Sequence, residues 1–294
     1  MAKITGTGTA LVTPFKKNGT IDEKSLRGLV EWQIRSKIEF LVPCGSTGES
    51  ATMTRAERRR VIEIVVDQNS GRVPIIAGTG TNSTLDSLDL THDAKEVGAD
   101  AVLLVGPYYN KPTQEGFYQH FKRIVEECNV KAVLYNVPGR TASNMLPETT
   151  LRIAEEVENV IAIKEASNNL EQIMQIIKYR PKNFAVLSGE DSLTLPIITA
   201  GGDGVISVIS NEVPKEYSDL TRAALKGDLK RARELHYKLF ELMKANFYES
   251  NPIPVKTALH LMGRIDESLR LPLTKISKPN REKLKKVLKD LKLI

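Results

Sequence analysis

The sequence predicts an α/β protein built as a (β/α)8 TIM barrel with a C-terminal helical appendage. Along the first two-thirds of its 294 residues, short apolar runs alternate about eight times with longer segments of helical periodicity. This repeated alternation of strand and helix is typical of a parallel barrel. The length agrees, because one barrel takes about 250 residues and leaves room for an appendage.

The expected strands are short runs rich in β-branched and aliphatic residues. They cover residues 10–12, 40–44, 74–78, 101–106, 132–137, 160–165, 184–188 and 204–209. Helical patterns between them include residues 22–37, 55–69, 84–97, 114–127 and 147–156. The alternative fold, an open doubly wound sheet, calls for a G-x-G-x-x-G turn after the first strand. Residues 6–11 (GTGTAL) lack the third glycine and no Walker A motif occurs, so nucleotide binding is weakly supported.

After about residue 213 the alternation stops and the chain is helical in pattern. The expected helices cover residues 215–225, 229–248, 255–262 and 278–292. Apolar residues recur at helical spacing beneath a basic face in the last of them, at Leu284, Val287, Leu288 and Leu291. We therefore expect two domains: a catalytic barrel over residues 1–224 and a helical domain over residues 225–294.

Composition excludes several classes of protein. Hydrophobic residues make up 41% and charged residues 27%, as in ordinary globular proteins. No apolar run reaches the ~20 residues that cross a bilayer, and the first six residues do not resemble a signal peptide. We therefore expect a cytoplasmic protein with no membrane partner. The net charge of +6 lies largely in the tail, without aromatic interleaving, so we expect no nucleic-acid partner.

Cysteine and histidine spacing argues against metal sites and disulfides. Cys44 and Cys128 form no C-x-x-C pair, and the four histidines show no H-x-H or H-E-x-x-H spacing. Both cysteines are expected to be small buried apolar residues. For Cys44 the alternative is a reactive thiol, because it precedes a glycine-rich turn.

Lys164 lies inside an otherwise apolar strand-like run, residues 160–166 (VIAIKEA). Removing an ammonium group from water costs free energy. The same desolvation lowers the pKa of a lysine and frees its amine as a nucleophile at neutral pH. Lys164 is therefore a candidate Schiff-base former. The alternative is a strand-end lysine whose ammonium reaches solvent.

Other candidate residues follow the ends of expected strands, where barrels place their active sites. Residues 45–49 (GSTGE) combine two glycines with hydroxyls and N–H groups, which suits either an anion cradle or a simple helix cap. Residues 106–112 (GPYYNKP) and 135–141 (YNVPGRT) supply tyrosines and an arginine. A tyrosine near an imine-forming lysine can relay protons, and an arginine can bind a carboxylate bidentately. Each tyrosine taken alone could be a packed residue; together these segments predict one site.

These segments resemble the signatures of the N-acetylneuraminate lyase family of pyruvate-dependent class I aldolases. The resemblance runs nearly end to end and includes residues 45–49, 108–112 (YYNKP), 135–138 (YNVP), 163–166 (IKEA), 188–191 (SGED), 204–207 (GVIS) and 251–256 (NPIPVK). The paired tyrosines at 108 and 109, together with Arg140, resemble the synthase branch of the family. That branch condenses pyruvate with L-aspartate semialdehyde in lysine and diaminopimelate biosynthesis.

The resemblance implies that Lys164 forms an imine with pyruvate and that no separate cofactor is needed. Tyr135 would relay protons to solvent through Ser46 and Tyr109. In the family, the counterpart of Tyr109 comes from a partner subunit across a tight dimer interface, and dimers pair into tetramers. A homotetramer is therefore expected.

The resemblance also implies the substrate contacts. Thr47 would hold the pyruvate carboxylate, and Arg140 would hold the semialdehyde carboxylate. Gly189 and Ile206 match backbone positions that line the family's pocket. One departure is Ser46, where synthases commonly have threonine; its hydroxyl is kept, but its rotamer is less restrained without the β-branch.

Two other functions remain open from the sequence. A sibling aldolase would cleave a sialic acid or a 2-keto-3-deoxy sugar acid, but it has little use for Arg140. A catalytically inactive relative would serve in metabolite binding or regulation, but it is expected to lack the lysine or the relay tyrosine. Many synthases of the family are inhibited by lysine, and Arg55 and Arg58 argue against strong inhibition here because two fixed cations repel an ammonium ligand.

Overall fold

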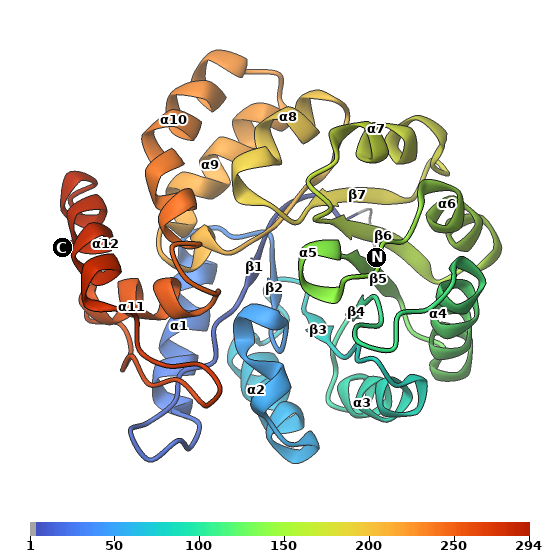
Figure 1. Ribbon diagram of the computed structural model, residues 1–294, viewed down its shortest axis with the longest axis horizontal. Helices are drawn as coiled ribbons and strands as arrows, with labels where there is room; N and C mark the ends of the chain where they lie inside the picture. Colours follow the sequence, from blue (N-terminus) through green and yellow to red (C-terminus); the bar gives the residue numbers. More distant parts are fainter. Residues whose placement is uncertain (1–3) are drawn as a thin grey trace.

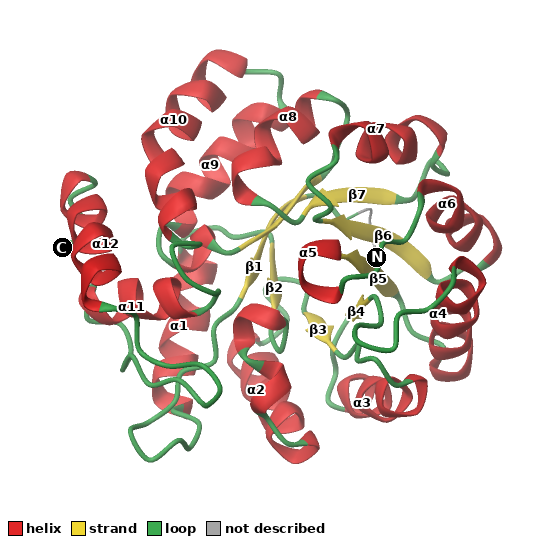
Figure 2. Ribbon diagram, in the orientation of Figure 1, coloured by secondary structure: helices red, strands yellow, loops and turns green. Residues whose placement is uncertain are grey.

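Eight parallel strands form the sheet at the centre of the molecule, and helices surround it (Figure 2). The computed structural model describes residues 4–294. The strand order is β2-β1-β8-β7-β6-β5-β4-β3, and backbone hydrogen bonds from Leu41 to Pro74 and from Gly78 to Pro43 bring β2 and β3 together. The sheet is therefore a nearly closed (β/α)8 barrel, as predicted. Its strands are β1 (Gly6–Ala10), β2 (Phe40–Val42), β3 (Ile76–Gly78), β4 (Ala101–Val105), β5 (Ala132–Asn136), β6 (Val160–Glu165), β7 (Ala185–Ser188) and β8 (Gly204–Ser207).

The barrel helices follow their strands in order around the ring (Figure 1). They are α1 (Glu23–Arg35), α2 (Arg55–Asn69), α3 (Thr84–Glu96), α4 (Gln114–Cys128), α6 (Pro147–Glu156), α7 (Leu170–Tyr179), α8 (Thr194–Thr199) and α9 (Pro214–Leu225). A short helix, α5 (Pro138–Thr141), follows β5 and lies over the barrel mouth (Figure 1). Local chemistry sets the helix starts: α2 begins with a capping box in which Thr54 and Glu57 exchange hydrogen bonds.

The C-terminal region consists of helices, as predicted. It contains α10 (Leu229–Ala245), α11 (Ile253–Leu261) and α12 (Lys278–Asp290). Leu284 and Leu288 of α12 are fully buried. They belong to a hydrophobic cluster that also contains Tyr217 of α9 and Leu235 of α10. The expected domain boundary, between residues 224 and 225, falls just before the last residue of α9. This cluster therefore contains residues from both expected domains.

Strand β1 is the element whose position differs most from the prediction. The expected run was 10–12, whereas β1 spans Gly6–Ala10 and is buried along its length. Its glycines and threonines carry little apolar signal. The glycines are needed because neighbouring atoms come close: a Cβ on Gly8 would lie 1.9 Å from the Phe40 ring. The strand is therefore defined by packing that a hydrophobic pattern does not show.

The structure contains no candidate membrane span: over residues 4–294, no helix combines enough length with enough apolar character.

Gly204 provides a test of the close packing between β8 and β1. Its φ is +154°, and an added Cβ would lie 2.1 Å from the Gly6 carbonyl oxygen. Gly204→Ala should lower the free energy of unfolding by about 1–3 kcal/mol or more, because backbone atoms cannot move aside cheaply. Chemical denaturation followed by circular dichroism measures it.

The matched control is Gly28→Ala, the same change inside α1, where an added Cβ meets nothing within 4 Å. It should raise the free energy of unfolding by about 0.5–1 kcal/mol, because alanine is the better helix former. Wild-type stability in Gly204→Ala would contradict the close approach.

Candidate active site

A cavity of about 540 Å³ lies at the carboxyl ends of the strands and brings most of the expected site residues together. Six of the eight line it: Ser46, Thr47, Tyr135, Arg140, Lys164 and Gly189. They come from the ends of four different strands or from the loops that follow them. This is where parallel barrels carry their catalytic residues.

Lys164 lies on β6 with only 5% of its surface exposed. The parallel register places it beside Tyr135 of β5 and Leu187 of β7. Burial lowers the pKa of Lys164 to about 8; the negative charge of Asp191 opposes this shift and the positive charge of Arg140 adds to it. A sizeable fraction of the amine is therefore unprotonated near neutral pH, as a nucleophile requires.

Tyr135 contacts Lys164 in the wall of the cavity. The Lys164 Nζ lies 4.3 Å from the centroid of the Tyr135 ring. Burial raises the pKa of Tyr135 to about 12, and Arg140 and the Ser46 hydroxyl act in the opposite direction. The phenol therefore stays protonated at neutral pH and has a hydroxyl neighbour toward which a proton can pass.

The turn at residues 45–49 supplies the polar groups opposite Lys164. Thr47 is buried, and its Oγ1 accepts a hydrogen bond of 2.9 Å from Asn251 Nδ2. Ser46 is exposed to the cavity. Hydroxyls and nearby N–H groups at such a turn suit a small carboxylate.

Arg140 lies on α5 at the outer edge of the cavity. It is exposed, and its Nη2 donates a hydrogen bond of 3.4 Å to the carbonyl oxygen of Asn251. Its remaining guanidinium donors can bind a carboxylate that enters from solvent.

Gly189 follows β7, and close packing favours a glycine there. A Cβ would lie 2.7 Å from the Ala166 Cβ and 3.1 Å from the Lys164 Cε, so it would clash with Ala166 and press against the lysine. Ile206, by contrast, is fully buried on β8 within the inner cluster that contains Tyr135. Among the described residues it does not line the cavity.

Tyr109 does not reach the cavity in the described chain. It is 91% exposed, and its backbone has a φ of 68°, which is uncommon for a residue with a side chain.

Several lining residues were not predicted as site residues. Glu190 and Asn251 line the cavity, and so does Phe247 from the loop after α10. Burial raises the pKa of Glu190, and the neighbouring Asp191 raises it further. Glu190 and Asn251 lie in two of the family-like motifs of the sequence, residues 188–191 and 251–256, so these motifs could have identified them. Phe247 lies in neither motif.

A smaller cavity of about 280 Å³ adjoins the first and is lined in part by Arg58 and Tyr108. Arg55 is not among its lining residues, and it forms ion pairs with Asp89 and Asp93. Two carboxylates therefore balance the charge of Arg55. Of the two arginines expected to repel free lysine, only Arg58 lines this cavity.

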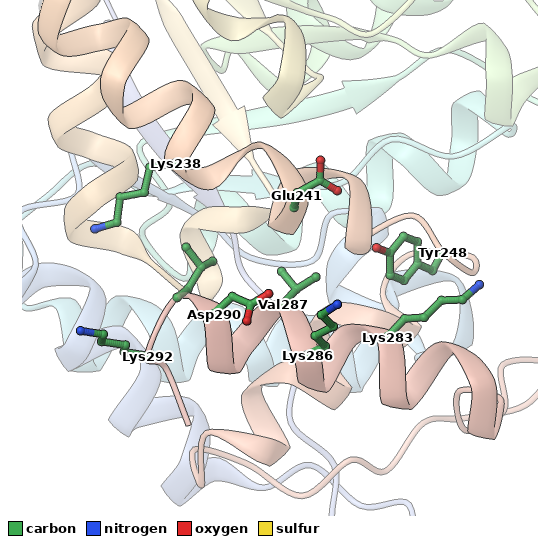
Figure 3. Close-up of a pocket in the computed structure, with 9 residues that line it drawn as sticks. Lys238, Glu241, Tyr248, Lys283, Lys286, Val287, Asp290 and Lys292 are labelled. Carbon is green, nitrogen blue, oxygen red and sulfur yellow. The ribbon is translucent and has the colours of Figure 1, made fainter.

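A third cavity, of about 750 Å³, lies between α10 and α12, far from the strand ends (Figure 3). Lys238 and Glu241 of α10 line one side of it, and Lys283, Lys286 and Asp290 of α12 line the other (Figure 3). It holds none of the expected site residues and combines charges of both signs. Within residues 4–294, no cluster of three or more potential metal ligands occurs there or elsewhere.

Comparison with known proteins gives consistent matches along the chain. Residues 3–291 match the model of the Dihydrodipicolinate synthetase family. A 4-hydroxy-tetrahydrodipicolinate synthase from Nitratidesulfovibrio vulgaris is 52% identical over 286 residues, which cover 97% of this chain and 98% of the relative.

Solved structures agree with these sequence matches. The dihydrodipicolinate synthase of Aquifex aeolicus has a TM-score of 0.97 at 47% identity and covers 99% of both chains. The chloride-inhibited enzyme of Acinetobacter baumannii, complexed with pyruvate, has a TM-score of 0.97 at 45% identity and covers 99% of this chain and 100% of its own. The barrel, the cavity around Lys164 and these matches together show that the chain belongs to the dihydrodipicolinate synthetase family.

Proposed function

We propose that this protein condenses pyruvate with L-aspartate semialdehyde to 4-hydroxy-tetrahydrodipicolinate, a step of lysine and diaminopimelate biosynthesis. The observation that carries the proposal is a buried lysine of lowered pKa, Lys164, in a cavity that also holds Thr47 and Arg140. The activity for which the relatives are named and a related structure with bound pyruvate support the same substrates. The sibling activity on sugar acids is less well supported, because Arg140 places a cation where those substrates need none.

In the proposed reaction, the neutral amine of Lys164 adds to the C2 carbonyl of pyruvate and loses water to form an imine. Loss of a proton from C3 gives an enamine, and this carbon attacks the aldehyde of the semialdehyde. The semialdehyde's amine then displaces Lys164 and closes the ring. The lysine is regenerated, so the reaction needs no separate cofactor.

The other residues bind the substrates and move protons. Tyr135 delivers and removes protons at the reacting atoms, and Ser46 lies on the path outward. Thr47 and the N–H groups of its turn hold the pyruvate carboxylate. Arg140 holds the carboxylate of the second substrate at the cavity edge.

We also propose that Tyr109 completes the relay in a neighbouring subunit. Its exposure and outward position support this, because the relay inside one chain ends at Ser46. A tight dimer is the minimum assembly for that exchange, and a homotetramer of two such dimers is the form we propose. The cytoplasm is the compartment we propose, since Cys44 and Cys128 are free thiols.

Lys164→Met should abolish imine formation with pyruvate, because the substitution keeps the side-chain bulk and removes the amine. In the wild-type protein, cyanoborohydride should trap one three-carbon adduct on the peptide that contains Lys164. The initial trapping rate should rise with pH through about 8 and then level off, because only the unprotonated amine reacts. The control Lys182→Met removes an exposed lysine and should leave trapping unchanged. An adduct on another lysine would contradict the assignment.

Tyr135→Phe should lower kcat by ~10²–10⁴-fold while changing the pyruvate KM much less, since a proton relay acts mainly in the transition states. Steady-state kinetics with both substrates measures this split. The control Tyr118→Phe also removes a hydroxyl, which bonds Glu156 outside the barrel, and kcat should stay at the wild-type value. Unchanged turnover in Tyr135→Phe would assign its hydroxyl a structural role.

Arg140→Ala should raise the KM for the semialdehyde by about ten- to a hundredfold, the effect of losing ~1.5–3 kcal/mol of charge-assisted hydrogen bonding. Pyruvate trapping on Lys164 should continue, and at a pH well above 8 its rate should match the wild-type rate, because the lost Arg140 charge changes only how much of the amine is protonated. The KM of Arg140→Lys for the semialdehyde should fall between those of the wild type and Arg140→Ala, because lysine keeps the charge and loses the bidentate geometry. Failure of Arg140→Ala at the trapping step would show that the arginine binds pyruvate instead.

A further inference from the structure

A buried ion pair joins the C-terminal region to the turn at residues 45–49. Lys256 of α11 has no exposed surface, and its Nζ lies 2.5 Å from Glu49 Oε1. The side chain of Glu49 is equally inaccessible. The two residues are 207 positions apart in the sequence. Two charges removed from water in this way need partners of good geometry.

Lys256 reaches the same turn by a second route. Its Nζ donates a hydrogen bond of 3.0 Å to the Thr13 carbonyl oxygen. The Thr13 hydroxyl in turn donates one of 2.8 Å to the Gly48 carbonyl oxygen. The ammonium also lies 4.5 Å from the centroid of the Phe15 ring, which favours a cation. The buried Lys256 amine is therefore linked to both of the last two residues of the turn, to Glu49 directly and to Gly48 through Thr13.

The backbone of Glu49 explains why such support is needed. Glu49 joins two single-turn helices, Ser46–Gly48 and Ser50–Thr52, with a φ of 55°. A residue with a side chain is disfavoured in this left-handed region and persists there only when its surroundings hold it. Its second carboxylate oxygen accepts a hydrogen bond of 3.2 Å from the Arg270 backbone N–H. Both oxygens of the strained residue are thus bound by the C-terminal region.

The consequence for the active site follows from the sequence of the turn. Ser46 and Thr47 lie three and two residues before Glu49, respectively, and both line the cavity around Lys164. A shift of Glu49 would move their hydroxyls and N–H groups relative to the lysine. Arg140 stands on a different element, α5, and neither Lys256 nor Glu49 bonds to it among the described contacts.

We propose that Lys256 is a positioning residue that acts through Glu49 and Thr13 to hold Ser46 and Thr47 in the geometry that binds pyruvate. This inference rests on the proposed function for its choice of substrate. It assigns the C-terminal region a part in the first half of the reaction. The second substrate's binding group, Arg140, bonds the carbonyl oxygen of Asn251 and neither Lys256 nor Glu49, so it lies outside this action of Lys256.

The test is the double variant Glu49→Gln/Lys256→Met. Single substitutions leave an unpaired buried charge and destabilise the fold, whereas the double variant removes both charges and keeps the side-chain volumes. Its melting temperature, followed by circular dichroism, should stay close to that of the wild type. Its KM for pyruvate should rise about tenfold, and imine trapping at fixed pyruvate should slow to match, because small misplacements of binding groups are costly. Its KM for the semialdehyde should change less than about twofold.

The matched control is Glu267→Gln/Arg281→Met, which removes an ion pair of the C-terminal region that does not contact the turn. Both KM values should stay at wild-type levels. A second variant, Glu49→Asp, keeps both charges and draws the carboxylate back by one methylene. It should raise the pyruvate KM about threefold, and it decides the matter if the double variant does not fold.

An unchanged pyruvate KM and trapping rate in a folded double variant would overturn the inference. So would an equal rise of both KM values, which would indicate general loosening of the site. Failure of the proposed function looks different: the wild-type protein itself would not turn over the semialdehyde. Pyruvate trapping, which does not need the second substrate, would still compare the variants.

Discussion

The free-energy cost of burying the Lys164 amine is the constraint on which the rest of the site depends. A lysine in water is protonated at neutral pH and does not attack a carbonyl, so its reactivity requires a dry barrel interior. A closely paired carboxylate would restore the charge. Asp191 and Glu190 raise the pKa of Lys164 only partly, and Arg140 opposes them. The balance leaves an amine that is buried and largely unpaired, yet reachable from the cavity.

The parallel register of the barrel brings other functional groups close to Lys164. Neighbouring strands run in the same direction, so Lys164 lies level with Tyr135 on β5, and the loops after all strands open on the same face. The same closeness limits what surrounds the lysine. At Gly189, an added Cβ would lie 2.7 Å from the Ala166 Cβ and 3.1 Å from the Lys164 Cε. A lysine at this depth therefore requires a small residue after β7.

The sequence predicted local elements well where hydrophobic periodicity was strong. Strand β6 and helices α2 and α6 have the expected bounds, because apolar periodicity is strong there and because α2 starts with a capping box and α6 with a proline. The prediction failed for β1, where close backbone packing replaces aliphatic side chains. It identified the segments around Lys164 and Arg140, and the structure brings these segments to one cavity. The contact between Thr47 and Asn251 could not be predicted, because periodicity carries no information across 204 residues.

The C-terminal helices are therefore part of the site's construction and not only a cover for one side of the barrel. Without them, Thr47 would lose the amide of Asn251, and the carboxylate of Glu49 would lose the Lys256 ammonium and the Arg270 N–H. A buried, unpaired carboxylate under a strained residue would drive the turn into another conformation. The barrel supplies the buried amine, and the C-terminal region holds in place the turn that we propose binds pyruvate. This division explains why a hydrophobic cluster spans the expected domain boundary: the two regions must pack as one body for the turn to keep its geometry.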